Sequence, residues 1–253
     1  MLTSETCMNK SCPVRRMPGG RPQAAGRRRA AFTLIELLTV ISIIALLATL
    51  GAGLAGVASR KAKESAIKAE LGKLTTAIEN YKADLHQYPP DNAKDGRNLN
   101  PAVHPLYYEL VGTFSTNNGN VYRTADRAEH VTATEIKNAF PGLGGFINSA
   151  VYPDKPRSYL RDLKPRQRRE IRLPGANDIE LLAVPVDWPR KLLDLSPLRN
   201  VTSDTRLREI NPWHYVSTRP TNNTASFDLW AIWATGRVVD GTNELRVFGN
   251  WKQ

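Results

Sequence analysis

The chain has 253 residues, of which 41% are hydrophobic and 23% are charged, and its net charge is +11. This length and composition suit one or two globular domains with a sizeable core and exclude a wholly disordered chain. Seven basic side chains but only one acidic side chain lie in residues 1–31, so the remainder carries an ordinary charge and no nucleic-acid partner is expected.

Residues 1–31 are rich in arginine, proline and glycine and show no periodic apolar pattern. This is typical of a cytoplasmic leader that is removed from the mature chain. Both cysteines of the chain, Cys7 and Cys12, lie in this segment without a downstream His/Cys cluster, so neither a zinc site nor a disulfide in the mature protein is expected. Translation starts at Met1 or at Met17, which begins a shorter leader.

The following residues, 32–58, form an apolar run whose only charge is Glu36. A membrane-spanning helix needs about 20 such residues, so the run predicts a transmembrane helix. Arginines at 27–29 directly precede it, and the positive-inside rule therefore places the N-terminus in the cytoplasm and the C-terminal bulk on the other side.

Three interpretations compete for this run and its costly carboxylate. A cleaved secretory signal would use the small residues at 56–58, and a plain anchor would merely tolerate Glu36. A cut between Ala31 and Phe32 would instead create a cationic α-amino group at Phe32, close to the same membrane edge. Glu36 of one subunit could then pair with the Phe32 amine of the next, which makes the carboxylate an assembly contact.

The stretch AFTLIELLTVISIIALLA, residues 31–48, resembles the N-terminal signature of type IV pilins and type II secretion pseudopilins. Phe32 to Glu36 match the first five mature positions of that family. The resemblance implies cleavage by a membrane prepilin peptidase between Ala31 and Phe32, and N-methylation of Phe32. The family usually has glycine where this chain has Ala31.

The helical pattern continues without a proline to Tyr88 and is expected to end at Pro89-Pro90. Residues 59–88 predict an amphipathic half that packs against a globular head or, alternatively, forms a coiled coil. Its apolar stripe consists of Ile67, Leu71, Leu74, Ile78, Tyr81 and Leu85. Glycines at 51, 53 and 56 suggest either a flexible joint or close helix packing in the membrane.

Residues 89–253 are expected to form the head, with an enlarged insertion at about 93–205. Residues 132–140 predict a short helix, and residues 226–236 alternate like a strand. Asp240-Gly241 predicts the turn of a closing hairpin. The segments 80–92, 211–217 and 226–236 resemble the major (G-type) pseudopilins. The basic stretch 154–172 is either a docking surface or a solvated loop.

The resemblance also raises the possibility of calcium between the last strands, where Asp240, Asn243 and Glu244 offer oxygen ligands. Thr235 stands where the family would place an aspartate. No catalytic constellation is visible in the sequence: GLGG at 142–145 is too short for a phosphate loop, and neither a G-x-S-x-G nor an H-E-x-x-H motif occurs.

Together these features predict an α+β, pilin-like fold in which a long N-terminal helix packs on a small C-terminal antiparallel sheet. The expected protein is a non-enzymatic pseudopilin of a type II secretion system, a single-pass protein of the bacterial inner membrane with a periplasmic head. Its expected partners are further copies, other pseudopilins, prepilin peptidase, the secretion assembly platform and the lipid bilayer. The alternatives are a type IV pilin and a monomeric membrane-anchored binding protein.

Overall fold

A computed structural model describes residues 32–253 except 117–118, 127–128, 152–153, 174–177 and 252–253, and it does not describe the side chains of 50–55. The chain divides into two compact units at Ala52/Gly53. No helix in the described part is both long and apolar enough to cross a membrane. The span expected over 32–58 is therefore not confirmed, and the side chains of its residues 50–55 lie outside the description.

The long helix predicted for the N-terminal part is present as α1, Leu34–Leu85, with 52 residues. It ends three residues earlier than the prolines suggested. His86 adopts φ 59°, its N–H donates to the Lys82 carbonyl over 2.9 Å, and the Lys82 Nζ donates to the His86 carbonyl. This is a left-handed helix termination in which histidine replaces the usual glycine.

The part of α1 in the second unit buries the predicted apolar stripe. Ile67, Leu74, Ile78 and Tyr81 are completely buried, and Leu71 and Leu85 pack partly buried against the same core. The stripe therefore packs against the head, as the 3.6-residue period predicts. The sequence did not single out Glu70, a buried carboxylate on this helix that accepts a hydrogen bond from the Gln167 side chain.

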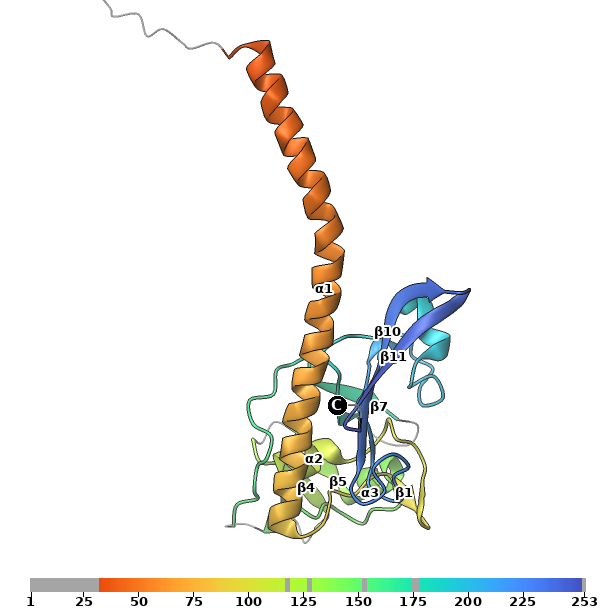
Figure 1. Cartoon of the computed structure of the whole chain (residues 1–253). Helices are drawn as coiled ribbons and strands as arrows, with labels where there is room; N and C mark the ends of the chain where they lie inside the picture. The colour runs from red at the N-terminus through yellow and green to blue at the C-terminus, as the bar shows by residue number, and fades with distance from the viewer. Residues whose placement is uncertain (1–31, 117–118, 127–128, 152–153, 174–177, 252–253) are drawn as a thin grey trace, which may run out of the picture. The chain divides into compact units, whose positions relative to one another are not determined.

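The C-terminal residues form an antiparallel sheet with the order β11-β10-β9. Its strands are β9 (His214–Val216), β10 (Asp228–Val239) and β11 (Thr242–Gly249). Asp240 and Gly241 connect β10 to β11 with φ of 50° and 74°, the two positive values that a type I′ hairpin turn requires. The predicted strand and hairpin are confirmed. Figure 1 shows the hairpin beside the part of α1 that belongs to the second unit.

The middle of the chain is more regular than its sequence suggested. Its elements are β1 (Ala93–Lys94), β2 (Arg97–Asn98), α2 (Leu106–Val111), β3 (Thr113–Thr116), β4 (Val121–Thr124), β5 (His130–Thr132), α3 (Ala133–Ala139), β6 (Ser149–Val151), β7 (Arg168–Arg172), β8 (Asp178–Leu182) and the 3-10 helices η1 (Arg190–Leu195) and η2 (Leu207–Glu209). The predicted short helix is α3, which Thr132 and Glu135 start with a reciprocal capping box.

Several of these middle elements, α2, α3, β4, β5, β7 and β8, contribute residues to the core. A four-stranded sheet has the order β5-β4-β3-β6, with β3 and β6 parallel, while β1-β2 and β7-β8 are two-stranded. All six residues of α2 are buried. The GLGG stretch also has a packing role, since Gly142 leaves no room for a Cβ atom against the Ala93 carbonyl. The middle segment is thus an integral part of the head's core.

Glu180 on β8 is a buried carboxylate with an unusual titration. It is 8% exposed, its Oε2 has no hydrogen-bond partner within the described chain, and burial raises its pKa to about 7. A raised carboxyl pKa means that the folded state retains a proton that the unfolded state has lost. The contribution of Glu180 to stability is therefore present below pH 4.5 and is lost as the pH rises to 7.

Glu180→Gln should remove this dependence. The rise of the pKa from 4.5 to about 7 sets an upper limit of about 3 kcal/mol, and solvent screening of the carboxylate reduces it, so we expect the variant to be more stable than the wild type at pH 8 by on the order of 1 kcal/mol, with no gain at pH 4.5. Denaturant unfolding of the full chain in detergent at both pH values measures the difference. A gain of equal size at both pH values would contradict the titration and indicate better packing instead.

Candidate assembly site

The first residues of α1 form a hydrogen-bonded cap around Glu36. The Glu36 carboxylate accepts from the Thr33 backbone N–H over 2.9 Å and from the Thr33 hydroxyl over 2.8 Å. In return, the Glu36 N–H donates to the Thr33 Oγ1 over 3.3 Å. Thr33 is thus the N-cap and Glu36 the third helical residue of a capping box. Within a single chain, Glu36 is a local helix cap.

The helix that follows this cap is apolar on all sides and exposed. Its large apolar side chains from Phe32 to Leu47 are between 48% and 82% exposed. They are Phe32, Leu34, Ile35, Leu37, Leu38, Val40, Ile41, Ile43, Ile44, Leu46 and Leu47. A contiguous exposed apolar surface of this kind indicates a segment whose partner is a bilayer or other helices.

The predicted site residues are described only in part. Phe32 is 81% exposed and Glu36 lies one helical turn further on, whereas Ala31 and the leader 1–31 lie outside the described residues. The cleavage, methylation and pairing roles of these residues stay predictions. The contact between Thr33 and Glu36 was not predicted, although the T-x-x-E spacing before an apolar run is the sequence pattern of a capping box.

The comparison with protein families concerns this same segment. Residues 26–52 match the family model described as "Prokaryotic N-terminal methylation motif". The chain carries a prepilin-type N-terminus. This motif indicates a protein of the type IV pilin-like kind, which is structural, is processed by prepilin peptidase and assembles with other pilin subunits. No curated protein and no solved structure matches the chain significantly.

The basic stretch 154–172 is partly a set of internal ion pairs. Arg157 contacts Asp84 over 2.6 Å, Arg169 contacts Asp187 over 3.1 Å, and Arg172 contacts Asp178 over 2.6 Å. Arg168 donates to the Tyr107 hydroxyl and lies 3.8 Å from Glu129. These arginines tie the stretch to the head, which weakens its interpretation as a free docking surface.

The oxygen atoms considered for calcium do not converge. Asp240 lies in the exposed turn, and Asn243 pairs with Val238 in the ladder. Glu244 accepts from the Thr235 hydroxyl over 2.8 Å and pairs with Arg246 over 2.9 Å, and these contacts hold its pKa below the usual range. Among the described residues, no three Asp, Glu, His or Cys side chains are grouped as metal ligands.

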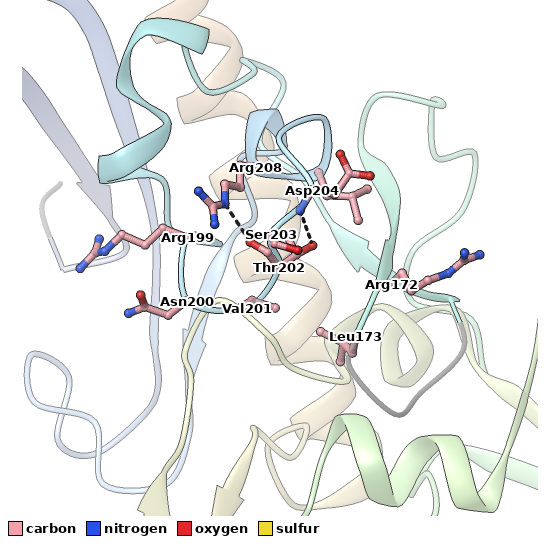
Figure 2. A pocket seen from close by; sticks show the side chains of 10 residues that line it. Arg172, Leu173, Arg199, Asn200, Val201, Thr202, Ser203, Asp204 and Arg208 are labelled. Atoms are coloured by element: carbon pink, nitrogen blue, oxygen red, sulfur yellow. Dashed lines mark hydrogen bonds between the residues drawn. The ribbon is translucent and has the colours of Figure 1, made fainter.

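A hollow of about 760 Å³ lies beside the loop 199–208 (Figure 2). Arg208 donates to the Thr202 carbonyl over 2.8 Å, whereas Arg172 and Arg199 extend toward opposite sides in Figure 2. Neither a nucleophile with a paired base nor a converging set of donors lines this hollow in the described part of the chain. The prepilin-type N-terminus is therefore the candidate functional site.

Proposed function

We propose that the chain is a pseudopilin subunit of a type II secretion system. Its apolar helix anchors it in the bacterial inner membrane with the head in the periplasm, and subunits polymerise through that helix into a short filament that drives protein export. The observation that carries this proposal is the methylation motif on a helix that is apolar on all sides and lacks a partner within the described chain.

Processing precedes assembly in this proposal. Prepilin peptidase cuts between Ala31 and Phe32, and the new Phe32 amine is methylated. The cut supplies the cation that Glu36 lacks in the precursor, so that carboxylate and amine pair between neighbouring subunits in the low-dielectric membrane. The resemblance of residues 211–217 and 226–236 to the major pseudopilins and the lack of cysteine after Cys12 favour a pseudopilin over a pilin with a disulfide-closed loop.

Mass spectrometry of the N-terminus tests the processing step. We expect the chain isolated from a host that has prepilin peptidase to begin at a methylated Phe32. Ala31→Leu should accumulate as uncut precursor, because the position before the cut requires a small residue, whereas Ala31→Gly should be processed like the wild type. A mature chain that begins at Ser59 would show a cleaved secretory signal and would contradict the proposal.

Deletion of the gene distinguishes the two filament types. A pseudopilin is expected to be needed for export of folded proteins across the outer membrane, while surface fibres and twitching motility stay unchanged. Loss of surface fibres with normal export would instead identify a type IV pilin. The Ala31→Leu precursor, returned to the deletion strain, serves as the control for a chain that is present but unprocessed.

A further inference from the structure

The β10–β11 hairpin extends along α1 toward its apolar end. Phe248 lies against Lys68, and Arg246 lies 3.7 Å from Glu64, about one helical turn earlier. Glu244 lines a pocket that reaches Val57. Residues nearer the start of β11 thus contact residues nearer the start of α1. The beginning of β11 therefore lies beside the residues that directly follow the apolar run 32–58.

A pocket of about 220 Å³ separates this end of the hairpin from α1 within the second unit. Trp233, which is 4% exposed, forms part of its wall. Its other lining residues are Val57, Arg60, Lys61, Glu64, Thr235, Arg237, Glu244 and Arg246. Four basic and two acidic side chains therefore line one small cavity.

The charges of this pocket are not balanced in pairs. Glu64 contacts Lys68 over 2.8 Å and Arg246, and Glu244 contacts Thr235 and Arg246. Both carboxylates are thus bound to neighbouring groups. Of the pocket cations, Arg60, Lys61 and Arg237 have no carboxylate within 4 Å among the described residues. Lys61 and Arg237 help to lower the pKa values of Glu64 and Glu244 from a longer distance, and the four cations and two carboxylates of the pocket leave a net positive charge, which attracts an anion.

The position along the helix suggests which anion. Arg60 follows the end of the apolar run by two residues and Glu64 by six, which is about 3–9 Å at the helical rise. The headgroup layer extends about 5–8 Å beyond the hydrocarbon core on each side. If the apolar run is the membrane anchor, the pocket lies in the headgroup layer, where the anions are lipid phosphates.

We infer that the pocket between α1 and the β10–β11 hairpin binds the phosphate group of an anionic phospholipid headgroup. Arg60, Lys61 and Arg237 supply the positive charge, and guanidinium groups suit phosphate because they donate two parallel hydrogen bonds. Trp233 contributes a buried apolar wall to the pocket. The contact would fix the head against the membrane surface; it rests on the proposed membrane anchor.

Native mass spectrometry of the full chain in detergent tests the site with three probes: short-chain phosphatidylglycerol, phosphatidylcholine and inorganic phosphate. We expect retention of phosphatidylglycerol but not phosphatidylcholine. Arg60→Gln combined with Arg237→Gln should weaken this retention at least about tenfold, at roughly 1 kcal/mol per basic residue near anionic lipid. The control, Arg161→Gln combined with Arg166→Gln, removes the same charge elsewhere and should retain the lipid like the wild type.

The other outcomes distinguish the ligand from free phosphate and the site from a nonspecific charge effect. Phosphate that displaces phosphatidylglycerol at equal affinity supports the anion site but identifies free phosphate as its ligand. Equal loss in both double variants, or in neither, overturns the site. Cross-linking of Arg60 or Arg237 to a second copy in preference to lipid would also overturn it. Carbonate extraction of native membranes tests the anchor separately, because release of the wild-type chain contradicts the anchor without affecting lipid binding in detergent.

Discussion

Replacing Glu109 with alanine is expected to lower the free energy of unfolding of the head by about 3–5 kcal/mol. Glu109 on α2 is completely buried, and burial raises its pKa. Its carboxylate accepts from the Ile147 N–H and the Asn148 N–H over 2.9 Å each, and from the Tyr81 hydroxyl over 2.8 Å. Alanine leaves the buried Tyr81 hydroxyl and Asn148 N–H, and the partly buried Ile147 N–H, without this acceptor, and an unsatisfied buried donor costs about 1–3 kcal/mol.

The same carboxylate connects segments that are distant in sequence. Through Tyr81 it joins α2 to α1, and through Asn148 it joins α2 to the segment that precedes β6. The Asn148 side chain donates back to the Glu109 carbonyl, and the Thr113 N–H donates to the Asn148 carbonyl. The loss should therefore lower the cooperativity of the whole head as well as its stability.

Two further variants separate the charge from its donors. Glu109→Gln keeps one oxygen acceptor and should cost less than alanine, while Tyr81→Phe removes a single donor and should cost about 1 kcal/mol. Glu79→Ala, an exposed residue on α1, is the control and should change stability by less than about 0.5 kcal/mol. Denaturant unfolding in detergent, followed by tryptophan fluorescence, measures all four. Equal costs for Glu109→Ala and Glu79→Ala would contradict the role of Glu109.

Long periodic features of this chain could be predicted from the sequence because their physics is local. The α1 stripe follows from the 3.6-residue period, and β10 follows from its alternation, with Leu229, Ala231 and Trp233 buried. The Asp240-Gly241 turn follows from its demand for two positive φ values. Each of these signals lies within a few residues of the structure that it determines.

The parts that were missed depend on contacts between distant residues. Nothing in the sequence around Glu109 distinguishes it from an exposed glutamate, because its donors lie 28 and 38–39 residues away. The short strands β1 to β8 are also too short to show a period. The packing of Trp251, which follows β11 in a turn with its ring 5.8 Å from Trp230, likewise depends on a residue 21 positions away. At the assembly site, the capping box could have been predicted from the T-x-x-E spacing. Pairing between subunits involves a second chain, so the structure of one chain does not show it.

Replacing Glu36 with glutamine is expected to abolish filament assembly while leaving the helix start intact. Glutamine at the third helical position still completes a capping box with Thr33, so the local contacts seen in the single chain survive. What it removes is the negative charge for the Phe32 amine of the next subunit. An ion deprived of its partner in a low-dielectric site costs about 3–5 kcal/mol, which corresponds to more than hundredfold weaker association.

Thr33→Val is the complementary variant, because it removes the capping hydroxyl and keeps the charge. The loss of an N-cap side chain costs about 1 kcal/mol, so assembly should fall by less than about tenfold. Filament yield after shearing, relative to the processed and methylated subunit in the membrane, measures both variants on equal terms. If Glu36→Gln assembled as well as the wild type and Thr33→Val did not, the carboxylate would act only as a cap of its own helix. If Glu36→Gln failed to assemble and Thr33→Val still assembled, Glu36 would be assigned to the contact between subunits. The Thr33 hydroxyl would then only hold the carboxylate in place before the neighbouring amine binds.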